Sequence, residues 1–175
     1  IWRLSNEITS YDQLMANEVK AASLADNMNL NFKRQVQEWK DVLLRGHDPA
    51  KLEKYWNAFH DLHRQIEDAA AQFLAMDISP DLLSHMRQFQ TDHQALLPLY
   101  KKGYDAFVSS GFDHRAGDAA VAGIDRAPTK ELEKLSNALS QVIQQKSKQS
   151  SEQASHAVMI SFILSLASIV VVGFV

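Results

Sequence analysis

The sequence contains no cysteine, and this absence excludes several kinds of site. A chain without thiols has no disulfide, no zinc-finger site, no covalently attached c-type haem and no cysteine nucleophile. Glycine and proline are also scarce, at 6 and 4 of 175 residues, which argues against collagen-like, loop-rich or disordered chains. The formal net charge is only −3 and no long basic stripe occurs, so nucleic acid is not expected as a partner.

The chain also lacks the short motifs that carry common enzyme chemistry. It has no Gly-rich phosphate loop, no nucleophile elbow and no zinc-protease motif. Its Asp and Glu residues are scattered along the expected helices. We therefore predict that the chain is not an enzyme, and we assign it no catalytic residue and no cofactor.

One long apolar run closes the sequence. Residues 157–175 read AVMISFILSLASIVVVGFV and carry no charge. As a helix this run would extend about 28 Å, close to the hydrocarbon thickness of a bilayer, so it predicts a C-terminal transmembrane helix. The opening Ile1-Trp2-Arg3 fits the interfacial end of an earlier membrane helix. We expect residues 1–3 to be the end of that earlier membrane helix and residues 4–156 to form a polar domain. Residues 157–175 would be the next membrane span of a longer protein.

Residues 4–156 have the periodicity of long helices. Apolar steps of three and four residues predict a first helix that ends at Gly46, with a stripe through Ala22, Ala25, Asn29, Phe32, Val36, Trp39 and Leu43. Asp48 and Ser79, each followed by proline, predict the starts of two further helices, which run to about Met76 and Ser109. Pro98 is expected to kink or break the third helix. A short helix near 118–125 precedes a last helix that starts at Pro128 and runs into the membrane.

The short connections between these helices predict the fold class. Consecutive helices joined by a few residues lie antiparallel to one another. We therefore predict an all-α fold, an antiparallel up-down-up-down four-helix bundle continuing into a C-terminal transmembrane helix. Both ends of the domain would then meet the membrane at one face.

Two adjoining segments resemble a known family. Residues 31–46, NFKRQVQEWKDVLLRG, and their continuation through His47-Asp48-Pro49 to Tyr55, Trp56 and Phe59 resemble the sensory domains of bacterial methyl-accepting chemotaxis proteins. The resemblance implies a homodimeric domain in the periplasm, anchored in the inner membrane, that binds a small solute. Binding would shift the last helix and act on cytoplasmic signalling partners through segments beyond this sequence. Similar domains occur in diguanylate cyclases and histidine kinases, and a non-sensing membrane-anchored scaffold is a further alternative.

Counting along the helices places one polar layer in the bundle. Asn29, His63 and His93 lie at similar heights on apolar stripes, so we expect them to form a buried polar layer. Such a layer can fix the register of the helices, contact a ligand or hold a metal. We predict no metal, because no Glu-x-x-His motif of di-iron bundles occurs. A b-type haem held by His63 and His93 would need a cavity that the neighbouring Phe and Leu residues are expected to fill.

An aromatic group lies nearer the end of the bundle away from the membrane. We take its members as candidate ligand-binding residues, together with two polar neighbours: Arg34, Gln35, Trp39, Tyr55, Trp56, Tyr100 and Tyr104. The alternative is an ordinary aromatic core. As a pocket wall, the group would need polar contacts from Arg34, Gln35, Lys40 or Arg45, which suit a carboxylate or phosphate group.

Overall fold

The computed structural model describes residues 16–149 and 151–152 with their side chains, and the backbone of 2–15, 150 and 153–172. Over these residues the chain forms helices and no strand, which confirms the predicted all-α class. The helices are α1 (Trp2–Arg45), α2 (Pro49–Leu74), α3 (Pro80–Ser109), α4 (His114–Ala120) and α5 (Arg126–Val172).

The starts of α2 and α3 follow from their capping residues. The Asp48 carboxylate accepts a hydrogen bond from the Ala50 amide at 3.0 Å, and the Ser79 hydroxyl accepts one from the Leu82 amide at 3.5 Å. These side chains satisfy amide groups that have no partner within the helix. Both predicted caps are therefore confirmed.

Two local predictions need correction. Pro98 does not break the third helix, because α3 runs through it to Ser109, and a kink at Pro98 stays a prediction. Pro98 is exposed, so the carbonyl that loses its helical partner can be hydrated. The short helix comes earlier than predicted, at His114–Ala120, because the Asp113 side chain caps it by accepting from the Arg115 amide at 2.9 Å.

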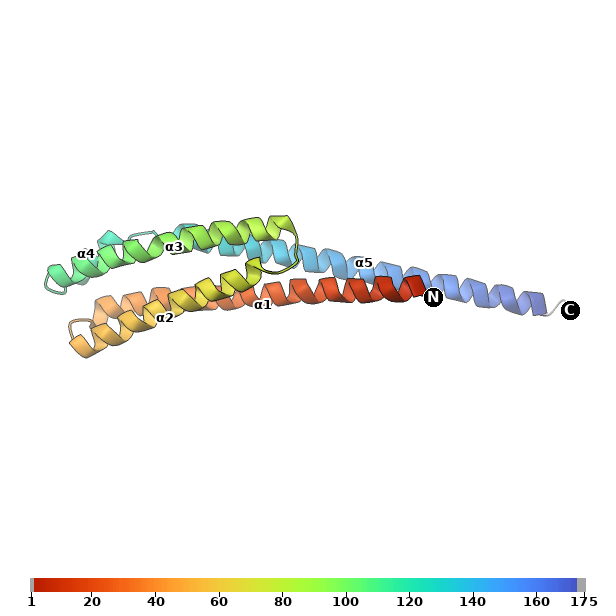
Figure 1. Ribbon diagram of the computed structural model, residues 1–175, viewed down its shortest axis with the longest axis horizontal. Helices are drawn as coiled ribbons and strands as arrows, with labels where there is room; N and C mark the ends of the chain where they lie inside the picture. The colour runs from red at the N-terminus through yellow and green to blue at the C-terminus, as the bar shows by residue number, and fades with distance from the viewer. Residues whose placement is uncertain (1, 173–175) are drawn as a thin grey trace. The chain divides into compact units, whose positions relative to one another are not determined.

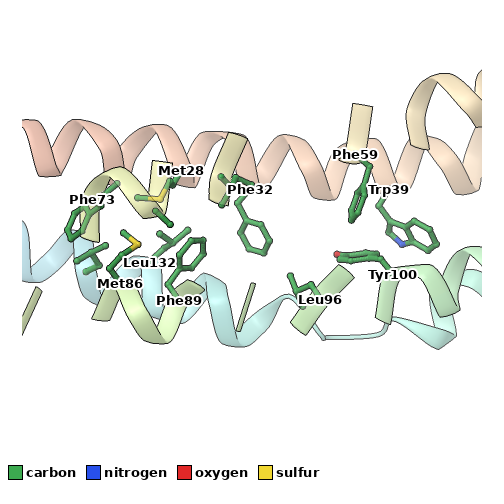
Figure 2. Close-up of a cluster of buried hydrophobic side chains, with 14 of the residues drawn as sticks. Met28, Phe32, Trp39, Phe59, Phe73, Met86, Phe89, Leu96, Tyr100 and Leu132 are labelled. Atoms are coloured by element: carbon green, nitrogen blue, oxygen red, sulfur yellow. The ribbon is translucent and has the colours of Figure 1, made fainter. Parts of the chain in front are cut away.

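The chain divides into two compact units, Ile1–Leu139 and Ser140–Val175. In the first unit α1 and α2 lie side by side (Figure 1), and α3 contacts the first turns of α5, where His85 lies 3.2 Å from Glu131. Large apolar side chains from these four helices fill the space between them (Figure 2). The labelled members come from α1 (Met28, Phe32, Trp39), α2 (Phe59, Phe73), α3 (Met86, Phe89, Leu96, Tyr100) and α5 (Leu132).

The buried stripe of α1 differs from the predicted one by a single residue at alternate positions. Its members recur at steps of four and three: Ala21, Ala25, Met28, Phe32, Gln35, Trp39 and Val42. The prediction shared Ala25, Phe32 and Trp39 with this stripe, and its Leu43 is buried as well, whereas Ala22, Asn29 and Val36 each follow a fully buried residue and are only half-buried. The sequence is compatible with both the predicted and the observed stripe, because apolar residues such as Ala22 and Val36 follow directly after the buried positions. As a result, the predicted layer residue Asn29 is only half-buried, whereas its neighbour Met28 is buried.

In the second unit the described residues belong to α5 and are mostly exposed. Lys148 and Glu152 approach to 4.0 Å across one turn of that helix. Among the residues searched, which are those described with side chains, no helix is long and apolar enough to cross a membrane. The predicted span at 157–175 and the predicted membrane end at 1–3 lie outside those residues.

Candidate functional site

Four polar side chains from three helices form a hydrogen-bonded layer inside the core. We call Gln35 of α1, His63 and Glu67 of α2, and His93 of α3 the polar layer. Gln35 Oε1 lies 2.9 Å from His93 Nε2, and Gln35 Nε2 lies 3.3 Å from His63 Nδ1. His93 Nδ1 lies 2.6 Å from Glu67 Oε1. Gln35 and His93 have no exposed surface, so these bonds are shielded from water.

The two histidines of the polar layer are held face to face. Their rings stack with centroids 4.4 Å apart and planes 20° from parallel. Phe89 stacks on His93 from the same helix, and Phe32 meets that ring edge-on. Burial, and to a lesser extent the neighbouring His93, lowers the pKa of His63 to about 4, so His63 is neutral at neutral pH.

Glu67 connects the polar layer to its polar surroundings. Its Oε2 accepts hydrogen bonds from Gln94 at 2.7 Å and from Gln90 at 3.3 Å. Burial by itself would raise the pKa of Glu67, but the hydrogen bonds from His93, Gln94 and Gln90 outweigh it and lower that pKa. Glu67 is therefore ionised at neutral pH and accepts hydrogen bonds at both oxygens. Glu67 was not among the predicted site residues, although its position four residues after His63 places both on one helix face.

The predicted layer and the observed one share two residues. The structure brings His63 and His93 together, as their heights on the helices predicted. It places Gln35, not Asn29, between them on α1, because the buried stripe passes through Met28 beside Asn29 and because the layer crosses α1 six residues nearer its C-terminal end than the predicted height. The buried Asn31 instead donates a hydrogen bond to Asn27 at 2.8 Å on the same helix.

The polar layer contains a donor set that transition metals use, but its geometry suits hydrogen bonding. His63, Glu67 and His93 offer ligand atoms within 4.8 Å of one another. An imidazole binds a metal through a lone pair in the plane of its ring, and two stacked rings direct these lone pairs along nearly parallel planes. Both nitrogens of His93 already face hydrogen-bond partners. We therefore do not assign these residues as metal ligands.

Four members of the predicted aromatic group, Trp39, Trp56, Tyr100 and Tyr104, contact one another in the same core, and Tyr55 packs against that core. We call Trp39, Tyr55, Trp56, Tyr100 and Tyr104 the aromatic cluster. Trp39 lies edge-on to Tyr100 at 5.3 Å and to Trp56 at 6.2 Å, and Trp56 stacks on Tyr104 at 4.6 Å. Figure 2 shows Trp39 and Tyr100 facing each other between α1 and α3. These ring contacts join the three helices.

Gly103 lets α3 approach Trp39 closely. A Cβ atom at Gly103 would lie 3.0 Å from the Trp39 ring and 2.6 Å from a methyl group of Val121. The Trp39 side chain is buried, and its Nε1 has no hydrogen-bond partner among the described residues. A buried donor without an acceptor costs free energy, so an acceptor bound at this N–H would remove that cost.

Cationic side chains border the aromatic cluster on its exposed side. Arg45 donates a hydrogen bond to the Tyr55 hydroxyl at 3.1 Å, and its guanidinium lies 5.6 Å from the ring centroid. Lys54 lies over the same ring at 5.3 Å, and Lys101 lies 5.8 Å from the Tyr104 centroid. Of the two predicted polar neighbours, Gln35 belongs to the polar layer, and exposed Arg34 donates to Asn31 at 3.4 Å. Arg45 is the predicted polar contact that the structure places at the cluster.

The helical core and its sensory-domain motif point to the bacterial chemoreceptors as a class. Over 138 residues, 79% of this chain, the sequence is 37% identical to the methyl-accepting chemotaxis protein CtpH of Pseudomonas aeruginosa. This similarity confirms the resemblance to methyl-accepting chemotaxis proteins that the sequence predicted. No family model matches the chain, and no solved structure matches it.

The chain spans 24% of the length of that relative. The similarity therefore concerns one region of a much longer receptor. What the whole receptor does is not carried over to this chain by the match itself.

Proposed function

We propose that this chain is the sensory region of a transmembrane chemoreceptor, which binds a small extracellular solute and has no catalytic activity of its own. The similarity to CtpH over most of the chain carries this proposal. The all-helical core supports it, because rigid packed helices can exist in two arrangements that a ligand favours differently.

The proposed architecture is an antiparallel up-down-up-down bundle in the periplasm, anchored by the run 157–175 and paired as a homodimer. Short connections between α1 and α2 and between α2 and α3 support the antiparallel order. The uncharged composition of 157–175 supports the anchor. A ligand would shift α5 and act on cytoplasmic signalling partners through segments outside this sequence.

We place the solute at the aromatic cluster. Binding sites for small molecules are mostly apolar with a few polar groups that fix orientation. The aromatic cluster has that composition: ring faces, the unpartnered Trp39 N–H, and the cations Arg45, Lys54 and Lys101 at its border. The charge of this border favours a small anionic solute.

A thermal-shift screen tests the proposed function. Amino acids, organic acids, inorganic phosphate and purines are added to the detergent-solubilised chain, and one compound is expected to raise its melting temperature. Calorimetry then compares Trp56→Ala in the aromatic cluster with His85→Gln, whose partner Glu131 lies on α5 at 3.2 Å. We expect Trp56→Ala to weaken binding at least tenfold and His85→Gln to leave it unchanged. Equal affinities in both variants would place the solute elsewhere.

Other outputs remain compatible with the same sensory region. A diguanylate cyclase or a histidine kinase would use an identical ligand step, and the sequence that follows residue 175 in the full protein would identify the output. A scaffold without sensing would bind none of the compounds. If no compound in the screen raises the melting temperature, the scaffold becomes the better proposal.

A further inference from the structure

The hydrogen bonds of the polar layer fix which of its atoms carry protons. Glu67 is a carboxylate and can only accept, so His93 Nδ1 is the donor in their 2.6 Å bond. Gln35 Oε1 is a carbonyl oxygen and also only accepts, so His93 Nε2 is the donor in the 2.9 Å bond. Both ring nitrogens of His93 therefore carry hydrogen, and His93 is an imidazolium ion paired with Glu67.

The amide nitrogen of Gln35 fixes the protonation state and the tautomer of His63. Gln35 Nε2 is a donor, so His63 Nδ1 accepts in the 3.3 Å contact. His63 is then neutral with its hydrogen on Nε2, which agrees with the effect of burial on this ring. The polar layer thus holds one positive charge on His93 and one negative charge on Glu67, and its bonds are all donor to acceptor.

The same four side chains have a second arrangement in which every hydrogen bond again joins a donor to an acceptor. This arrangement contains one proton fewer. If His93 Nε2 loses its proton, it becomes an acceptor and faces the carbonyl oxygen of Gln35, which is also an acceptor. A half-turn of the Gln35 amide removes this conflict, since Nε2 of Gln35 then donates to His93. Gln35 Oε1 then faces His63 Nδ1, so the hydrogen of His63 must move from Nε2 to Nδ1 to restore the second bond.

We propose that the polar layer is a two-state proton switch, in which release of one proton from His93 turns the Gln35 amide over and changes the tautomer of His63. The proton released from His93 Nε2 goes to water, while His93 Nδ1 keeps its hydrogen and its bond to Glu67 in both states. The switch links α1, α2 and α3, since each supplies a member that changes its bonding. It stands whether or not the aromatic cluster binds a solute.

The groups that face the switch are few. On α2 they are His60, His63 and Glu67, all of which act on the charge of the layer. On α1 the layer is faced by the neutral Gln35, and on α3 by the amides of Gln90 and Gln94. The described part of α5 gives the core the apolar Leu132, Leu135 and Leu139, while its Glu131 pairs with His85 of α3. The helix α4 packs elsewhere, with Gly117 against Leu43 and Phe107.

Long-range proton–nitrogen NMR correlation of the histidine rings tests this switch on the unmodified 175-residue chain in detergent. At neutral pH we expect two protonated nitrogens on His93 and a hydrogen only on Nε2 of His63. As the pH is raised, the loss of the His93 Nε2 hydrogen should occur with the same midpoint as the move of the His63 hydrogen to Nδ1. A neutral His93 at neutral pH, or a His63 tautomer that does not follow His93, would overturn the proposal.

Two variants provide controls for this measurement. His85→Gln removes one set of ring signals outside the layer and should leave the coupled change of His63 and His93 intact. Gln35→Met retains the length of the side chain but removes both amide bonds, so the rings of His63 and His93 should titrate with separate midpoints. A common midpoint in Gln35→Met would show that the amide does not couple the rings. If Gln35→Met does not fold, the spectra of the unmodified chain still decide the question.

Discussion

The polar layer and the aromatic cluster are built on the same three helices but are stabilised by different interactions. In the polar layer, each of the four side chains depends on hydrogen bonds that must match donor to acceptor. In the aromatic cluster, ring contacts tolerate small displacements, and the one buried donor, Trp39 Nε1, has no partner among the described residues. The comparison shows that, within the described part of the chain, one helical core can satisfy every donor and acceptor in one layer and leave a buried donor without a partner in another.

The largest expected effect comes from removing an aromatic ring at the base of the cluster. Phe59 is fully buried, stacks on Trp56 at 5.1 Å and meets Tyr100 at 4.8 Å. We expect Phe59→Ala to lower the free energy of unfolding by about 3–5 kcal/mol, since it removes these contacts and leaves a cavity. Urea unfolding measures this loss. Phe112→Ala, at a ring that is 40% exposed, should cost less than about 1 kcal/mol, and equal losses would contradict a packed cluster.

Breaking the polar layer should have the next largest effect. Gln35→Leu leaves His63 Nδ1 and His93 Nε2 buried without a partner, and we expect a loss of about 2–4 kcal/mol in the free energy of unfolding. Gln37→Leu makes the same substitution at an exposed position of α1 and should change stability by less than about 0.5 kcal/mol. Unfolding curves that coincide for the two variants would show that the polar layer adds nothing to stability.

The polar layer should also make stability depend on pH. The folded-state pKa of His63 is lowered to about 4 from an ordinary 6.5. Its contribution to the free energy of unfolding is therefore complete above pH 6.5. It is lost as the pH falls toward 4, because the unfolded chain binds the proton first. Glu67 has a lowered pKa as well, so its contribution to the free energy of unfolding is lost as the pH falls below its ordinary value of 4.5. We expect a loss of about 2–3 kcal/mol between pH 7 and pH 4. His63→Gln should flatten this decline, and an unchanged slope in that variant would refute the assignment to His63.

The smallest effect on stability is expected at Trp39. Trp39→Phe keeps an aromatic ring in the cluster and removes an N–H that has no partner, so the free energy of unfolding should change by less than about 1 kcal/mol. Its effect on binding should be larger. Once the screen has identified a solute, calorimetry should show about tenfold weaker binding to Trp39→Phe, as for the loss of one hydrogen bond. Unchanged affinity would mean that this N–H does not contact the solute.

Much of the helical pattern could be predicted from the sequence, because it depends on local signals. Asp48 and Ser79 before proline set two helix starts, and the caps are formed as expected. The stripe of α1 could not be fixed, since Ala22 and Val36 offer an apolar alternative beside the buried residues. Only packing against α2 and α3 selects Gln35 over Asn29 for the polar layer.

Electrostatic partners were harder to predict than apolar ones. The aromatic rings could be grouped by their heights on three helices, and the contacts of Trp39, Trp56 and Tyr100 follow that grouping. Glu67 was missed because a carboxylate between apolar positions looks like a residue on the solvent face. Its role depends on the rotation of α2 toward His93, which the periodicity of one helix does not determine.

A chimeric receptor tests the central claim most directly. This chain replaces the matching region of CtpH, and swimming cells that carry the chimera are placed in a gradient of the compound identified by the thermal-shift screen. If the chain is a sensory region, the cells respond to that compound, and they lose the response when Trp56→Ala is introduced. A chimera that is made in normal amounts but gives no response to a compound that the chain binds would contradict the proposed sensory function.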